Sequence, residues 1–327
     1  MRNESYAEEG AFHIGYLLVL CTPMAALALA LLVGDVEISV RELFEILIEG
    51  PFAERADAFK TYAVWGLRLP RAVCAGLAGA ILCLCGALLR RSTGLAAMGP
   101  FVIGAAPSAV FGLFCLQLVH SRWLLPAPII AGIGIPFIAW TITDNMTKWD
   151  YRAKLPLIGF LSGSLLLAAT ALLKTSPGLG FRDALELSRL IGSFRLSSWP
   201  NILPLLLSFC LLLLLCSTQG ENLDALAKGF DIKARNRIII VAVCCGSAAI
   251  AAAHFGALPL IGFVIPHLVD RCLPDWRHRS APSSAALGAT VLILLDTISR
   301  ARGEIPVGSV ILAFGLPLFI ITIMEDA

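Results

Sequence analysis

Apolar runs of about 20 residues, the length that a helix needs to cross a bilayer, follow one another along almost the whole chain. Of the 327 residues, 58% are hydrophobic and only 15% are charged, whereas soluble domains carry about one-quarter charged residues. Because the seventh and eighth runs are almost contiguous, hydropathy alone allows nine or ten crossings. We expect an all-α, polytopic membrane protein with about ten transmembrane helices in a single domain, residues 1–327. The candidate spans are residues 13–34, 70–89, 100–119, 124–143, 155–173, 200–217, 237–255, 258–273, 282–299 and 306–324.

The eighth run is interrupted in a way that a simple membrane anchor would not be. Between residues 258 and 268 it contains Pro259, Gly262, Pro266 and His267. Each proline removes a backbone donor, and an ionisable ring is costly in hydrocarbon. Such a segment is tolerated where neighbouring helices or a water-filled path satisfy the freed groups. We therefore expect Gly262, Pro266 and His267 to mark a broken helix along a pathway through the protein.

Two polar segments outside the spans have patterns of their own. Residues 35–69 contain apolar side chains at helical spacing, which predicts an amphipathic helix on the bundle or at the membrane surface. Residues 220–237 are longer than a turn requires and allow a short helix that Gly229 ends. This segment is either a plain connector or a knob that contacts a partner protein. The apolar positions of the first segment are Val40, Leu43, Phe44, Leu47 and Ile48.

Arginines gather at the ends of two spans. Arg68 and Arg71 are three residues apart at a helix start and share a face, and a guanidinium suits a carboxylate bidentately. The alternative is that they extend toward lipid headgroups. Arg300 and Arg302 at the end of the ninth span allow the same two interpretations, interfacial anchoring or docking of an acidic partner. The number of basic residues on each side does not decide the orientation of the chain.

Other classes of function have weak support in the sequence. No basic tract indicates nucleic acid, and no phosphate-binding Gly-rich loop with Lys is present. The cysteines and histidines lack the spacing of paired ligands, so we predict no metal site and no cofactor. Two alternatives stay open: a haem-binding electron carrier that uses His254 and His267, and an ion-coupled secondary transporter. The latter needs buried acids, and Asp296 is the only acid well inside a span.

Several short motifs occur in an order and spacing that are specific when taken together. The chain resembles the FecCD-type permeases, the membrane subunits of ABC importers for ferric siderophores, haem and vitamin B12. The resemblance covers nearly the whole chain. The connection between Arg300 and Glu304 is about three residues shorter than in the family, and residues 95–100 keep only its last proline. The motifs are Arg68–Arg71 (RLPR), Leu157–Phe160 (LIGF), Gly262–His267 (GFVIPH), Glu304–Gly308 (EIPVG) and Gly315–Phe319 (GLPLF).

The resemblance implies a ten-helix permease of the bacterial inner membrane that carries an iron chelate. We expect a ferric siderophore, with haem or cobalamin as alternatives. The implied partners are a separate ABC ATPase, a periplasmic or lipid-anchored substrate-binding protein, and a second permease subunit, either a copy or a paralogue. The implied sites are docking of the binding protein by Arg68, Arg71, Arg300 and Arg302; coupling to the ATPase by Asp224, Ala227, Lys228, Gly229, Phe230 and Asp231; and family motif positions Pro306, Gly308, Gly315 and Pro317.

Overall fold

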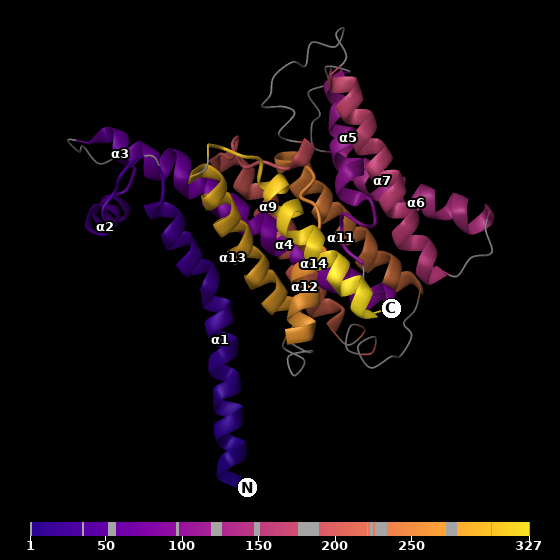
Figure 1. Ribbon diagram of the computed structural model, residues 1–327, viewed down its shortest axis with the longest axis horizontal. Helices are drawn as coiled ribbons and strands as arrows, with labels where there is room; N and C mark the ends of the chain where they lie inside the picture. Colours follow the sequence, from indigo (N-terminus) through magenta and orange to yellow (C-terminus); the bar gives the residue numbers. More distant parts are fainter. Residues whose placement is uncertain are drawn as a thin grey trace.

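The computed structural model describes residues 2–34, 36–51, 57–95, 98–118, 126–146, 151–175, 190–220, 222, 225, 234–272, 280–301 and 303–326, and this part of the chain is helical without a β-strand (Figure 1). A helix lies on each of the ten runs that were predicted to span the bilayer. The predicted all-α, polytopic fold is therefore confirmed. The ten helices are α1 (Arg2–Leu32), α4 (Leu69–Thr93), α5 (Ala105–Leu118), α6 (Pro126–Met146), α7 (Tyr151–Thr175), α9 (Trp199–Thr218), α11 (Ala234–Phe255), α12 (Ile261–Cys272), α13 (Ser280–Ala301) and α14 (Val307–Asp326).

The described helices differ in how much of the bilayer they could cross. By length and apolar composition, five could span it alone: α1, the continuous helix Ala58–Thr93, α9, α11 and α13. The apolar parts of α5, α6, α7 and α14 are shorter. In Figure 1, α5, α6 and α7 form a group on one side of the bundle, and α1 runs down the other side. Helix α4 lies between them and packs against α1, α9, α11, α12 and α13.

Small residues allow α4 to occupy this central position. A Cβ atom added at Gly79 would lie 2.3 Å from the carbonyl oxygen of Gly288 on α13. One added at Gly86 would lie 1.5 Å from the carbonyl oxygen of Gly262 on α12. Both distances are too short for any side chain, so the two helix backbones touch α4 directly. Close approach through small residues is the usual way in which membrane helices associate.

The chain is broken just before the eighth helix, whereas Gly262, Pro266 and His267, which were expected to mark a broken helix, lie within the continuous helix α12. Helix α11 ends at Phe255, and α12 begins only at Ile261 after a non-helical stretch that includes Gly256 and Leu260, both with positive φ (86° and 56°). Helix α12 has 12 residues, which corresponds to a length of about 18 Å. Two separate helices therefore occupy the seventh and eighth runs. Pro266 lies inside α12 and is buried.

The loop between α1 and α4 contains further helical segments. Helix α2 is stabilised at its N-terminus by a capping box, in which Ser39 and Glu42 each accept a hydrogen bond from the backbone N–H of the other. Leu43 and Ile46 are buried against Val64 and the end of α1. The segments are α2 (Val40–Glu49), α3 (Ala58–Tyr62) and the π-helical turn η1 (Ala63–Arg68). Other predicted apolar positions on α2 are exposed: Val40, Phe44 and Ile48.

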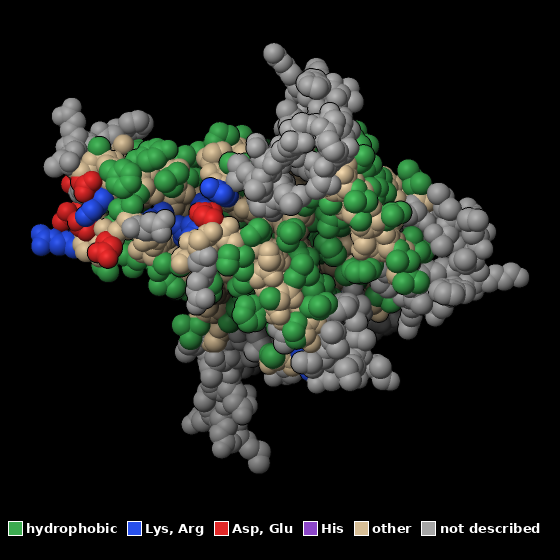
Figure 2. All heavy atoms as spheres, turned by 45° about the horizontal axis from the view of Figure 1, so that its top comes forward, with side chains coloured by type: hydrophobic (Ala, Val, Ile, Leu, Met, Phe, Trp, Pro, Cys, Tyr) green, Lys and Arg blue, Asp and Glu red, His purple; other side chains and the backbone are tan. Residues whose placement is uncertain are grey.

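The surface has the composition that a lipid environment requires. Apolar side chains cover much of the face drawn in Figure 2, and charged side chains gather at the end formed by α2 and α3. Helix α9 illustrates the apolar part, because Leu203, Leu207 and Leu214 are all more than half exposed. Exposed leucines at this density are typical of helices that contact lipid or another membrane subunit.

Candidate functional site

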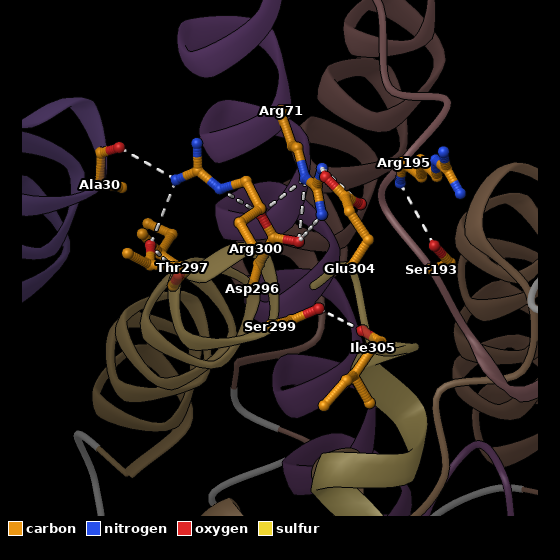
Figure 3. Close-up of polar contacts among 11 residues, drawn as sticks. Ala30, Arg71, Ser193, Arg195, Asp296, Thr297, Ser299, Arg300, Glu304 and Ile305 are labelled. Carbon is orange, nitrogen blue, oxygen red and sulfur yellow. Dashed lines mark hydrogen bonds and ion pairs between the residues drawn. The ribbon is translucent and has the colours of Figure 1, made fainter. Parts of the chain in front are cut away.

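Charged side chains from three parts of the chain meet where α4 begins and α13 ends (Figure 3). Arg71 lies in the first turn of α4, Asp296 and Arg300 lie near the end of α13, and Glu304 lies in the connection to α14. Helices α4 and α13 pack along each other and bring these distant parts of the sequence together. We call Arg71, Asp296, Arg300 and Glu304 the α4–α13 charge cluster.

Arg71 and Asp296 form the buried centre of this cluster. The Nε atom of Arg71 donates to both carboxylate oxygens of Asp296, at 3.1 and 3.0 Å, and Nη2 donates to Oδ1 at 3.0 Å. The side chain of Asp296 is 1% exposed and that of Arg71 is 10% exposed. A carboxylate inside a membrane helix requires a counter-charge. The guanidinium edge of Arg71 supplies that charge, and the pair joins α4 to α13.

Glu304 holds the other side of the same guanidinium. The Nη1 atom of Arg71 donates to the two carboxylate oxygens of Glu304, at 2.9 and 3.1 Å. Unlike Asp296, the Glu304 side chain is 37% exposed. Its backbone has φ of 64°, in the left-handed region that residues other than glycine seldom adopt. The tight turn is fixed by a hydrogen bond from Glu304 N to Ser299 O (3.1 Å) and by one from the Ser299 hydroxyl to Ile305 O.

Arg68 and Arg300 cap the C-terminal end of α1. The last four carbonyls of a helix have no intrahelical donor. Arg68 Nη1 donates to Leu31 O and Leu32 O, at 2.8 and 3.3 Å, and Arg300 Nη2 donates to Ala30 O at 3.0 Å. The remaining carbonyl, Leu29 O, accepts from the backbone N–H of Val33, the residue after the helix, at 3.1 Å. The positive side chains also oppose the negative end of the helix dipole. The two arginines therefore attach α1 to the start of α4 and the end of α13.

The sequence suggested contacts with headgroups or with a partner for these arginines, and the structure adds contacts within the chain. Arg68 is 5% exposed, and its guanidinium donates to Leu31 O and Leu32 O at the end of α1 and to Val36 O in the loop that follows. Arg71 is engaged by two carboxylates, and Arg300 Nε lies 3.6 Å from Asp296 Oδ2. Sequence reasoning missed the roles of Asp296 and Glu304 as partners of Arg71. The signal that was available is the acid within a span, which implies a counter-charge nearby.

The predicted pathway residues lie on α12 against α4. A Cβ atom on Gly262 would be 2.6 Å from the carbonyl oxygen of Leu82, which explains the need for glycine there. Pro266 and His267 are buried, and the His267 ring stacks on Phe263 with centroids 5.8 Å apart. These contacts fix α12 beside the central helix. A role of these residues in a pathway stays a prediction.

The C-terminal motif positions lie at the start and middle of α14. Pro306 directly precedes the helix, and Pro317 lies inside it. The backbone N–H of Gly308 donates to Gly192 O at 3.2 Å, and a Cβ atom on Gly308 would lie 1.5 Å from Ile191 O. Gly315 faces Leu260 in the break before α12. The motif thus permits close packing of α14 on two irregular segments.

The remaining predicted site residues lie outside the part of the chain that the structure describes. They are Arg302 and the six proposed coupling residues Asp224, Ala227, Lys228, Gly229, Phe230 and Asp231.

Chemically, the α4–α13 charge cluster is suited to recognition and attachment. A guanidinium stays protonated in proteins, so Arg71 cannot act as a base, and Asp296 is occupied by it. Glu304 is partly exposed and contacts Nη1 of Arg71. Nη1 is therefore the atom at which a carboxylate from another molecule could reach the cluster.

Comparison with known proteins assigns the chain to a family. A sequence profile of the FecCD transport family matches residues 20–325. The vitamin B12 import system permease protein BtuC of Vibrio cholerae is 31% identical over 273 residues, covering 79% of this chain and 81% of that protein. BtuC of Escherichia coli is 30% identical, with 94% of each chain covered. The molybdate import system permease protein MolB of Haemophilus influenzae is 28% identical, with 88% of each covered.

A solved structure supports the fold. It represents an inward-facing ABC transporter assigned to the metal-chelate type, and it matches with a TM-score of 0.76 over 97% of this chain and 99% of that chain. Its sequence identity is 24%. Because the family profile covers nearly the whole chain and the helices reproduce the fold of such a transporter, this chain belongs to the FecCD transport family, whose members are multi-pass inner-membrane permeases of ABC importers.

Proposed function

We propose that this permease moves a metal chelate into the cell, with a ferric siderophore as the expected cargo. The observation that supports it most is the match to the FecCD transport family over residues 20–325. The described helices form a packed bundle that carries the α4–α13 charge cluster. Transport requires no covalent chemistry on the cargo. ATP hydrolysis would come from a separate ATPase, and the cargo would arrive on a soluble binding protein. A second permease subunit, identical or paralogous, would complete the pathway.

Cobalamin is the second candidate cargo. It is favoured by the BtuC proteins of Vibrio cholerae and Escherichia coli, which are 31% and 30% identical to this chain. Cobalamin is also a metal chelate, so both cargoes fit the same general proposal. The test is uptake into proteoliposomes that contain the permease, its ATPase and its binding protein. We expect ATP-dependent accumulation of radiolabelled ferric siderophore. Accumulation of labelled cobalamin or molybdate alone would reassign the cargo.

The proposed docking face contains Arg71 and Arg300, with Arg302 as a neighbour. Arg68 would contribute by its charge and by holding the end of α1 beside this face. What supports it is charge: Arg68, Arg71 and Arg300 carry three positive charges, against the two negative charges of Asp296 and Glu304. Electrostatic complementarity of this kind steers encounter with an acidic partner and is weakened by salt. Replacing Arg71 with Gln should weaken binding-protein docking more at low salt than at high salt. Docking that is unchanged at every salt concentration would contradict the assignment.

The proposed coupling segment, residues 220–237, would transmit ATPase closure to the bundle through Asp224, Ala227, Lys228, Gly229, Phe230 and Asp231. Its test is Gly229→Val, because a β-branched residue disfavours the left-handed conformation with which glycine ends a helix. We expect ATP hydrolysis to continue while uptake is lost. Gly134→Val on α6 is the matched control, since it lies outside the segment and a Cβ atom added there meets nothing within 4 Å. Normal uptake by the Gly229 variant would show that the segment is wrongly placed.

An ion-coupled secondary transporter is the competing proposal from another class. It would need a buried acid that can bind and release a proton or cation, and Asp296 is the acid within the spans that the sequence offers. Its carboxylate accepts three hydrogen bonds from Arg71, which leaves little capacity for an ion. Vesicles that contain only this chain should therefore fail to accumulate solute. Accumulation driven by an ion gradient would overturn the proposed ATP-driven mechanism.

A further inference from the structure

The two carboxylates on Arg71 are held very differently. Asp296 is 1% exposed and is bonded through Nε and Nη2, so it cannot leave without exposing a buried charge pair to hydrocarbon. Glu304 is 37% exposed and contacts Nη1 alone. Figure 3 shows the two acids on different sides of the same guanidinium. The ion pair of Arg71 with Asp296 is therefore fixed, whereas another carboxylate could replace Glu304 at Nη1.

The backbone around Glu304 favours exchange further. Glu304 has φ of 64° and follows Gly303, which has φ of 84°. A glutamate in the left-handed region is strained, and the strain persists only while surrounding contacts enforce it. The ion pair with Arg71 is one of those contacts. Release of the carboxylate would remove a reason for the strained turn, which lowers the net cost of losing the pair.

We propose that Glu304 is an internal carboxylate that occupies Arg71 in the free permease and is displaced by an acidic side chain of the substrate-binding protein. This inference rests on the proposed docking role of Arg71. A carboxylate that replaces a carboxylate leaves the charge around Arg71 unchanged and reproduces the same paired N–H donation. Glu304 thus weakens docking and rejects partners that lack a suitably placed acid, because such partners cannot compensate Arg71.

The exchange also connects docking to α14. Glu304 lies shortly before Val307, where α14 begins, and its carboxylate is the ionic attachment of this connection to α4. The hydrogen bonds from Ser299 to Ile305 and from Gly308 to Gly192 hold the neighbouring residues. Release of Glu304 would leave the start of α14 held by these hydrogen bonds. An event at the surface would in this way alter the attachment of a membrane helix.

The test compares carboxylate binding by four forms of the full chain in nanodiscs of zwitterionic lipid: wild type, Glu304→Gln, Arg71→Gln and the double variant. The probe is a fluorescent hexaglutamate peptide, with hexaglutamine as the uncharged control, and the measurement is anisotropy at low salt. We expect Glu304→Gln to bind hexaglutamate about tenfold more tightly than wild type, within the usual range of coupling between sites. The double variant should lose this gain. Glu45→Gln on α2 is the control and should match wild type, because Glu45 lies outside the α4–α13 charge cluster and its ion pair with Arg41 is exposed.

The possible outcomes separate this inference from the docking proposal. If Arg71→Gln weakens binding but Glu304→Gln equals wild type or binds more weakly, docking stands and the internal competitor is wrong. If Arg71→Gln has no effect in either background, the docking proposal fails as well. Should the Gln variant not fold, as judged by gel filtration and circular dichroism, Glu304→Asp takes its place, since the shorter side chain withdraws the carboxylate from Nη1 and must also tighten binding. The binding protein that copurifies with the transporter from native membranes should rank the variants in the same order, and the reverse order would overturn the inference.

Discussion

Replacing Asp296 with Asn tests whether the buried pair with Arg71 holds α4 and α13 together. The substitution keeps the shape of the side chain but removes its charge and places an amide N–H₂ against the N–H donors of Arg71. Removal of one partner of a buried ion pair costs about 3–5 kcal/mol. Arg71 still pairs with Glu304 in this variant, so we expect the free energy of unfolding to fall by about 3 kcal/mol, the lower end of that range.

The assay is thermal unfolding in detergent at one fixed heating rate, because membrane proteins of this size unfold irreversibly. At roughly 2 °C per kcal/mol for a chain longer than 250 residues, the melting temperature should fall by about 6 °C. Glu45→Gln is the control: its i,i+4 pair with Arg41 is exposed and contributes about 0.5 kcal/mol, or about 1 °C. The melting temperature of the Arg71→Gln/Asp296→Asn double variant should fall by less than the sum of the decreases in the two single variants. An Asp296 variant that melts with the Glu45 control would refute the structural role of the pair.

Two further predictions concern packing and pH. Gly86→Ala should destabilise the bundle by about 1–3 kcal/mol or prevent its assembly, whereas Gly134→Ala, where an added Cβ meets nothing within 4 Å, should fold normally; equal melting temperatures would contradict the close contact with α12. In the capping box of α2, hydrogen bonds from Lys60 and Ser39 lower the pKa of Glu42 from 4.5 to about 2. The cap should therefore be fully present above pH 4.5 and should be lost as the pH falls from there toward 2, which amide hydrogen exchange of α2 would detect. Lys60→Gln should raise the pKa of Glu42 toward its ordinary value, and a wild-type Glu42 that already titrates near 4.5 would show that the cap is not formed.

Much of the fold could be predicted from the sequence, because the decisive signals are local. Runs of apolar residues located the ten helices, but the break between α11 and α12 lies at residues 256–260, before Gly262 and Pro266, which were expected to mark it. The sequence did not reveal that α4 is the central helix, since hydropathy does not distinguish a helix surrounded by protein from one surrounded by lipid.

The arginines show why the site was harder to predict. Arg68 and Arg71 occupy similar positions in the sequence, yet one caps α1 and the other pairs with acids more than two hundred residues away. A local pattern gives the residue type at a helix end but not which distant carbonyl or carboxylate comes to lie beside it. Glu304 has a positive φ, and the sequence gives no sign of this because the residue at that position is not a glycine.

The attachment of α14 suggests which helix would respond to a change at the α4–α13 charge cluster. Helix α4 is held by direct backbone contact at Gly79 and Gly86, so moving it would disrupt packing on two sides. Helix α14 packs on α12 and α13, and the side chain of Phe314 in its described part is 68% exposed. An open apolar groove of about 140 Å³ lies among α12, α13 and α14 and is lined by Val264, Val291 and Phe314, among other residues. Displacing α14 therefore costs less packing than displacing α4, and the carboxylate exchange at Glu304 acts on the helix that is easier to move.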